Sequence, residues 1–168
     1  MLSAAAAETV VHAFIASRLD YCNALLYGVS DRLMCRLQSV QNAAARLVTG
    51  ARRCDHITPI LRQLHWLPVR QRVLFKIAVL VFQCLAGQAP SYLSDDCQPV
   101  SDSRPRRLRS SDSLSCVVRR AHNTYGDRCF GPRVWYSLPA ELQQCSSLRQ
   151  FKLCLKTFLF RLALCDSL

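Results

Sequence analysis

The stretch from Gln41 to Arg72 limits the possible folds more than any other part of the chain. Apolar residues at four- and three-residue spacing lead up to Gly50, and glycine commonly follows the last turn of a helix. Thr58 then precedes Pro59, and Pro68 opens the next helical pattern. Proline at the first helical position loses no hydrogen bond. The stretch therefore predicts a helix end, a basic turn, a short helix and the start of another helix.

The rest of the chain also shows mostly helical spacing, which predicts a mainly α protein. We expect helices over residues 3–27, 31–50, 58–64 and 68–85, and an amphipathic helix that follows the capping-box pair Ser147 and Gln150. Gly28 should end the first helix, and Ser30 or Asp31 should cap the second. The side chains expected on buried faces are Val10, Phe14, Leu25 and Leu26, then Leu33, Leu37, Val40, Ala44 and Leu47, and finally Phe151, Leu155, Phe158 and Leu162.

A change in composition near residue 95 predicts the domain organisation. Residues 1–94 are expected to form a small helical bundle, residues 95–124 a basic, poorly ordered loop, and residues 125–168 an aromatic segment followed by the C-terminal amphipathic helix. Two segments leave an alternative open. Leu114–Val118 can be read as a strand, and Cys129–Leu138 as a second strand of a short β-hairpin or as an aromatic plug.

The charge balance points to a polyanionic partner. The chain has 22 Lys and Arg against 11 Asp and Glu, a net charge of +11, and only Lys76, Lys152 and Lys156 are lysines. The planar guanidinium group suits bidentate contacts with phosphate, which favours nucleic acid over a membrane surface. The same excess also fits a solvated surface without a ligand. The candidate nucleic-acid-binding residues are Arg52, Arg53, Arg62, Arg70, Arg72, Arg104, Arg106, Arg107 and Arg109.

Aromatic side chains next to these arginines could stack on bases if they were exposed. The aromatic residues in question are Trp66, Tyr125, Trp135 and Tyr136. In a helical protein such residues more often belong to the core, and we favour that interpretation.

Signs of catalysis and of metal binding are weak. Asp95-Asp96 is the only adjacent carboxylate pair, but it lies between a helix end and a proline-bearing loop, unlike a paired magnesium site. Cys54, His56 and His65 do not make up a closed metal site. We therefore expect no catalytic residue, no metal site and no cofactor in the given sequence.

The ten cysteines include no CxxC pair, and several lie in apolar helical patterns. A free thiol in such a pattern behaves as a small hydrophobe, so we expect a reducing compartment, cytoplasmic or nuclear. The N-terminal residues lack the basic region of a signal peptide. The longest apolar run, 73–85, is too short to span a bilayer, and we expect no membrane partner.

Several long strings resemble the carboxy-terminal region of non-LTR (LINE-type) retrotransposon reverse transcriptases of the jockey and chicken-repeat group. HITPILRQLHWLPVRQR is the most specific of them. The strings, in family order, are AFIASRLDYCNALLYG (13–28), LQSVQNAAARLVTG (37–50), HITPILRQLHWLPVRQRVLFKI (56–77), GQAPSYLSD (87–95), LRSSD (108–112), YGDRCF, GPRVWYSLP and FKLCLKTFLF (125–160).

The resemblance implies a fragment that contains the end of the reverse transcriptase thumb and the tail. In the family, the catalytic aspartates and their Mg²⁺ belong to a palm domain, which would lie upstream, so no catalytic residue is carried over to this chain. Phe130 and Pro132 are separated by one residue where the family typically has more, a departure that fits a decaying element copy.

Two classes of function follow, with a third possibility that the product does nothing. The first is a non-catalytic fragment that binds RNA or DNA without sequence preference through its arginines. The second is a helical interaction module that docks on the missing palm domain or on another protein. Its apolar contact would be the stripe from Phe151 to Leu162 or the first helix.

Overall fold

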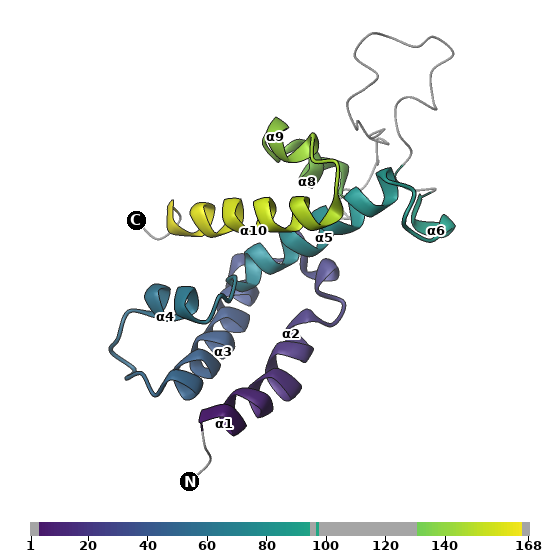
Figure 1. Ribbon diagram of the computed structural model, residues 1–168. Coiled ribbons are helices and arrows are strands. Elements are labelled where there is room, and N and C mark those ends of the chain that lie inside the picture. Colours follow the sequence, from purple (N-terminus) through teal and green to yellow (C-terminus); the bar gives the residue numbers. More distant parts are fainter. Residues whose placement is uncertain (1–3, 95–96, 98–130, 166–168) are drawn as a thin grey trace, which may run out of the picture. The chain divides into compact units, whose positions relative to one another are not determined.

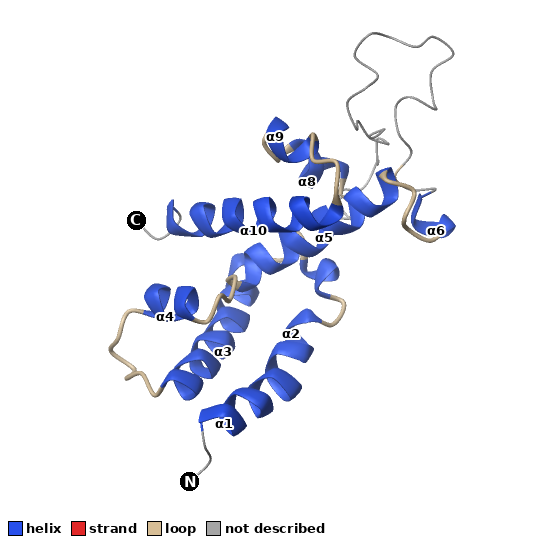
Figure 2. Ribbon diagram, viewed as in Figure 1, coloured by secondary structure: helices blue, strands red, loops and turns tan. Residues whose placement is uncertain are grey.

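The computed structural model describes residues 4–94, 97 and 131–165, and every regular element in these ranges is a helix (Figures 1 and 2). The prediction of a mainly α protein is confirmed. The basic loop at 95–124, apart from Cys97, and the strand suggested for Leu114–Val118 lie outside the described residues. The elements in chain order are α1 Ala4–Val11, η1 His12–Ala16, α2 Ser17–Asp20, η2 Asn23–Leu26, α3 Asp31–Thr49, α4 Ile57–Gln63, α5 Val69–Leu85, α6 Ser91–Ser94, α8 Pro132–Tyr136, α9 Ala140–Gln143 and α10 Leu148–Cys165.

Contacts divide the described chain into two compact units. The first unit contains the residues up to Val73 together with those from Leu159 onwards, and the second contains the residues from Leu74 to Phe158. The predicted division at residues 94 and 124 stays a prediction. We describe each unit by itself.

The first helical segment is shorter than expected. α1, η1 and α2 follow one another without a break and pack beside α3, but the segment ends at Asp20 rather than near Gly28 (Figure 1). Tyr21 is extended, and Cys22 adopts the left-handed conformation with a φ of 49°. A left-handed cysteine is rare, and no glycine or proline marks this break in the sequence.

The apolar stripe predicted for this segment was wrong. Val10 and Phe14 are exposed, Phe14 to 72%, whereas Val11, Ala16 and Leu19 are buried. The cause lies in η1, which is a π-helix and holds more residues per turn than an α-helix. Residues before and after such a turn do not share one 3.6-residue period, so a stripe counted at that period drifts off the buried face.

The buried face of α3 is also rotated from the predicted one. Ala44 is buried as expected, but Leu33, Val40 and Leu47 are exposed, Leu47 to 65%. The residues that α3 buries are Met34, Gln41, Ala44 and Ala45. Alanine and glutamine carry a weak apolar signal, so the leucine and valine positions dominated the count. Gly50 closes the helix in the left-handed conformation at a φ of 69°, as predicted.

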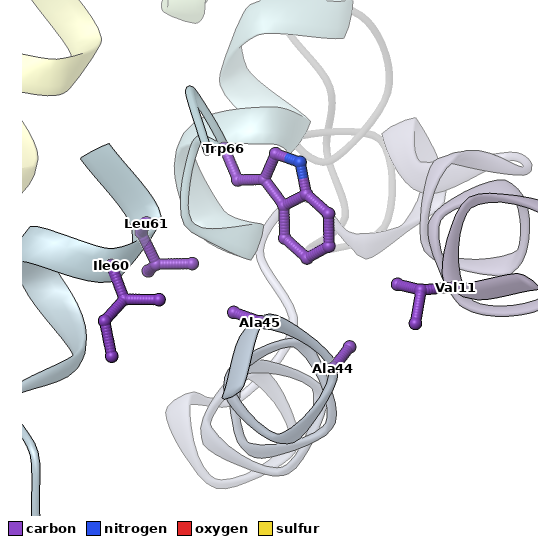
Figure 3. Close-up of a cluster of buried hydrophobic side chains, with 6 residues drawn as sticks. All are labelled: Val11, Ala44, Ala45, Ile60, Leu61 and Trp66. Carbon is purple, nitrogen blue, oxygen red and sulfur yellow. The ribbon is translucent and has the colours of Figure 1, made fainter. Parts of the chain in front are cut away.

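Trp66 is the centre of the first unit's core. Figure 3 shows its indole turned toward Ala44 and Ala45 on α3, with Ile60 and Leu61 of α4 on one side and Val11 of α1 on the other. The ring of His12 meets the indole edge-on at a centroid distance of 5.6 Å. The small alanine side chains leave room for the large indole, which confirms the core interpretation of Trp66.

The short helix predicted with Thr58 as its N-cap and Pro59 as its first residue is present as α4, but its start was placed two residues late. α4 begins at Ile57, and His56 occupies the N-cap position without a side-chain hydrogen bond. Thr58 is therefore no N-cap, and Pro59 is the third helical residue. Proline is still tolerated there, because the N–H groups of the first turn have no partner within the helix.

Two glutamines of α3 hold the chain on both sides of Pro68. Gln41 Nε2 donates to the Leu67 carbonyl oxygen at 2.8 Å, and Val69 N–H donates to Gln38 Oε1, also at 2.8 Å. Gln38 Nε2 donates to Gln41 Oε1 at 3.0 Å and so joins the two contacts. Gln41 is almost fully buried. Because buried polar groups must be paired, these bonds fix where α5 begins, one residue after the predicted Pro68.

The second unit contains a cluster of three aromatic rings. Phe82 of α5 stacks on Phe151 of α10 at a centroid distance of 4.5 Å, and Trp135 of α8 lies 5.8 Å from Phe151. The strand suggested for Cys129–Leu138 is wrong over Pro132–Tyr136, which is helical. Trp135 is fully buried, as the alternative of an aromatic plug predicts for the described part of this segment.

Gly131 shows how closely α8 approaches α5 in this unit. A Cβ atom on Gly131 would lie 2.6 Å from Val81 Cγ2 and 2.8 Å from Ile77 Cγ2. Real Cβ contacts are essentially never so short, and both neighbours are branched side chains of the buried α5 face. Glycine is therefore required here by space.

The predicted C-terminal amphipathic helix is confirmed as α10. Ser147 Oγ accepts a hydrogen bond from the Gln150 N–H at 3.2 Å, one half of the predicted capping box. Phe151 and Leu155 are fully buried, Phe158 is half-buried, and Leu162 is exposed. Most of the predicted stripe is thus used in the chain's own core.

Candidate nucleic-acid interface

The turn after α3 presents two exposed arginines. The Arg52 N–H donates to Asp55 Oδ2 at 2.7 Å, and the Asp55 N–H donates to the Arg52 carbonyl oxygen at 3.1 Å. Arg46 Nη2 adds a bond to the Asp55 carbonyl oxygen at 3.3 Å. These bonds fix the turn through its backbone. The side chains of Arg52 and Arg53 are exposed, and neither forms an ion pair within the described part of the chain.

Arg62 continues this positive surface on α4. It lies in the last turn of the helix and is exposed, whereas Ile60 and Leu61 of the same helix point into the core. A cation near a helix C-terminus is favoured by the unpaired carbonyl groups there. Between Arg46 and Arg62 the chain holds four arginines and one aspartate, so this segment is strongly basic.

Arg70 and Arg72, in the first turn of α5, have a different environment. Arg70 Nη2 forms an ion pair with Asp31 Oδ1, and both side chains are largely exposed. Arg72 Nη1 donates to Asp20 Oδ1 at 2.9 Å, and the Arg72 side chain is only 16% exposed. Sequence reasoning missed both aspartates, because they precede their partners by 39 and 52 residues. Charge pairs at such separations leave no local pattern.

The five described arginines do not form one patch. Arg70 pairs with the first residue of α3, while Arg52 and Arg53 follow its last residue. With a rise of 1.5 Å per residue, the two ends of this helix lie about 27 Å apart. We therefore distinguish the turn arginines, Arg52, Arg53 and Arg62, from the paired arginines, Arg70 and Arg72. The remaining candidates, Arg104, Arg106, Arg107 and Arg109, lie outside the described residues.

Half of the aromatic candidates are unavailable for base stacking. Trp66 and Trp135 are buried, and Tyr125 lies outside the described residues. Tyr136 is exposed. Three aromatics that were not candidates for base stacking, Phe14, Tyr21 and Tyr92, are also exposed. Tyr21 directly follows Asp20, the partner of Arg72.

The chemistry that the turn arginines can offer is positive charge with fixed hydrogen-bond donors. Guanidinium groups donate to phosphate oxygens in a planar fork, and they do so without regard to base sequence. Among the described residues, no group of three or more histidine, cysteine, aspartate and glutamate side chains is placed to hold a metal ion. Nor does any helix there combine the length and the apolar character needed to cross a membrane.

The chain was compared with models of protein families, with curated proteins and with solved structures. No family model, no curated protein and no solved structure matches it.

Proposed function

We propose that the chain is a non-catalytic thumb-and-tail portion of a retrotransposon-type reverse transcriptase and that it binds RNA or DNA without sequence preference. The long strings at residues 37–50 and 56–77 support the family assignment. The observation that carries the binding proposal is the set of turn arginines, which are exposed and lack an ion-pair partner in the described chain.

The proposed mechanism is neutralisation of phosphates by guanidinium groups. A protein that neutralises phosphates releases condensed counterions. The logarithm of its affinity therefore falls linearly with the logarithm of the salt concentration. Arg52 and Arg53 share one turn, and α4 brings Arg62 into the same unit. Asp55 keeps its negative charge, but its carboxylate accepts the backbone N–H of Arg52 and forms no ion pair with a guanidinium group in the described chain.

Filter binding of a single-stranded RNA at two salt concentrations tests the proposal. We expect the logarithm of the affinity to fall steeply between about 50 and 200 mM salt, in proportion to the number of phosphates contacted. The control is an unrelated protein of similar size and net charge. Binding no stronger than that of the control would refute the proposal.

A second candidate function, a helical interaction module, is favoured by one specific observation. Val10 and Phe14 are large apolar side chains on the outer face of the first helical segment, and both are exposed. The other contact considered for this function, the stripe from Phe151 to Leu162, is unsuitable because Phe151 and Leu155 are fully buried. A missing palm domain is the partner that the resemblance suggests.

Light scattering on the purified chain distinguishes the second candidate. Apolar side chains that normally meet a partner promote self-association when the partner is absent. We expect self-association that the double substitution Val10→Ser and Phe14→Ser reduces. A monodisperse monomer at all concentrations would count against the interaction module without touching the RNA-binding proposal.

A further inference from the structure

One side of α10 carries three cations. Arg149, Lys152 and Lys156 follow one another at steps of three and four residues, and this spacing places them on the same side of the helix. Arg149 and Lys152 are exposed, and Lys156 is half-buried. All three belong to the second unit, whereas the turn arginines belong to the first. None of the three was a candidate from the sequence.

The core determines which side of α10 faces the solvent. Phe151 and Leu155 are fully buried, and Phe151 stacks on Phe82 of α5 at a centroid distance of 4.5 Å. The Gln150 N–H donates to Ser147 Oγ at 3.2 Å and so fixes the start of the helix. Rotating α10 to cover the cations would expose both apolar side chains to water, which is unfavourable. The side with the cations is therefore held in the solvent.

The charges on this side of α10 are not balanced by carboxylates of the same helix. Between Glu141 and Asp166 the sequence contains no acidic residue. Arg149 and Lys152 form no ion pair within the described ranges of the chain. The paired arginines of α5 differ in this respect, because an aspartate from another helix meets each of them. Arg149 and Lys152 thus keep their full charge for a ligand.

These cations do not help the helix to form. Like charges three or four residues apart destabilise a helix, and a cation in the first turn, such as Arg149, is disfavoured by the helix dipole. A polyanion removes both penalties when it binds. From Arg149 to Lys156 the helix rises about 10 Å, so the cations form a row rather than a single point of charge. A row of positive charge is complementary to the successive phosphates of one strand.

Leu153 lies among the cations and is 62% exposed. It follows Arg149 by four residues and precedes Lys156 by three, so it lies next to both on the helix surface. A duplex offers mainly phosphates and sugars to such a surface, because its bases are paired and stacked. An unpaired strand also offers bases that can contact an apolar side chain. The combination of cations with an exposed leucine favours a single strand.

We infer that Arg149, Lys152, Leu153 and Lys156 form a second contact surface for single-stranded nucleic acid, the α10 surface. The inference rests on the proposed function, in which the turn arginines contact the strand from the first unit. The cations of the α10 surface contact phosphates, and Leu153 contacts a base or a sugar. Two contact surfaces on one chain increase the affinity for any strand that is long enough to reach both.

Two exposed lysines of the second unit provide a matched test on the intact chain. Lys152 belongs to the α10 surface, Lys76 lies on α5, and neither forms an ion pair in the described structure. Lys152→Glu should weaken binding of a long single-stranded RNA roughly tenfold at about 0.1 M salt and lower the salt slope by about 0.7 or more. Lys76→Glu makes the same charge change and should weaken binding less than about threefold. Filter binding measures both quantities, and far-UV circular dichroism checks the fold.

Leu153→Ser tests the preference for a single strand without a change of charge. It should weaken binding of single-stranded RNA roughly threefold and leave binding of a duplex of equal length unchanged. Polyglutamate serves as a competitor that carries charge without phosphates or bases. Displacement of the RNA by polyglutamate as effectively as by unlabelled RNA would indicate an acidic protein as the partner of the α10 surface and would overturn the inference.

The outcomes separate this inference from the proposed function. An equal loss of affinity in Lys152→Glu and Lys76→Glu would show that net charge alone matters, and the α10 surface would be refuted. If only R52Q, R53Q and R62Q weakened binding, the inference would fall while the proposed function stood. If only Lys152→Glu did so, the α10 surface would stand and the role of the turn arginines would fall. A wild-type chain that bound RNA no better than an equally basic control would refute both.

Discussion

Each turn arginine and each paired arginine carries one positive charge, but only the turn arginines lack an ion-pair partner in the described structure. Arg52, Arg53 and Arg62 keep exposed guanidinium groups with no ion pair in the described structure. Arg70 and Arg72 meet Asp31 and Asp20, which neutralise them within the first unit. A count of basic residues therefore overstates the charge that is available to a polyanion.

The comparison also separates two roles for arginine. Arg72 is mostly covered, and its hydrogen bond to Asp20 joins α5 to the end of α2. A guanidinium group that is mostly covered and hydrogen-bonded contributes to folding and is poorly accessible to an outside phosphate. Exposed arginines contribute little to the free energy of folding, and they give up few interactions within the protein when they bind a phosphate. We expect binding to depend on the turn arginines and stability to depend on Arg72.

The largest effect should come from removing the turn arginines. The triple substitution R52Q, R53Q and R62Q should weaken binding of single-stranded RNA roughly 100-fold at about 0.1 M salt, because each lost phosphate contact lowers the salt slope by about 0.7. Filter binding measures both quantities. The matched control R70Q and R72Q should change affinity less than about threefold, and an equal loss in both variants would break the comparison.

The next largest effect concerns the hydrogen bonds on both sides of Pro68, which hold the start of the helix that carries Arg70 and Arg72. Gln41→Ala removes the donor to the buried Leu67 carbonyl oxygen and should lower the free energy of unfolding by about 2 kcal/mol. Urea denaturation measures the change. Gln63→Ala, at an exposed position of α4, is the control and should have almost no effect. A similar loss in both would show that the buried bond is unimportant.

The ion pair of Arg72 should contribute less than this buried bond. Arg72→Ala removes a charge-assisted hydrogen bond of 2.9 Å, but Asp20 remains 54% exposed and can be solvated. We therefore expect a destabilisation of about 1 kcal/mol. Asp20→Asn tests the same pair from its other side. If Arg72→Ala reduced the free energy of RNA binding by more than it reduced the free energy of unfolding, the assignment of Arg72 to the paired arginines would be wrong.

The smallest effect is expected for Arg70. Arg70 and Asp31 are exposed to 55% and 81%, and solvent screening leaves such pairs little net energy. Arg70→Ala should change the free energy of unfolding by less than about 0.5 kcal/mol in urea denaturation. A larger loss would mean that Arg70 and Arg72 act as one network.

Element positions were predictable where a strong local signal exists. Gly50, Pro68 and the pair Ser147 and Gln150 mark real helix ends, to within one residue for Pro68. The faces were less predictable. The π turn at His12–Ala16 changes the residue period, and α3 buries alanines and glutamines that a count of large apolar residues overlooks.

The candidate site was only partly predictable for a related reason. Exposure of Arg52 and Arg53 follows from a polar turn after a helix C-cap, which is a local feature. The neutralisation of Arg70 and Arg72 depends on aspartates far away in the chain. No single-sequence pattern reports such long-range neighbours.

The two glutamine amides of α3 are oriented to match the chain segment that they bind. Gln38 Oε1 accepts a hydrogen bond from the Val69 N–H, and Gln38 Nε2 donates to Gln41 Oε1. Gln41 Nε2 in turn donates to the Leu67 carbonyl oxygen. Rotating either amide by half a turn would oppose donor to donor and acceptor to acceptor. The two amides are therefore matched in orientation, so neither can rotate alone, and a segment that offered its donor and acceptor in the reverse order would be bound only if both amides rotated together.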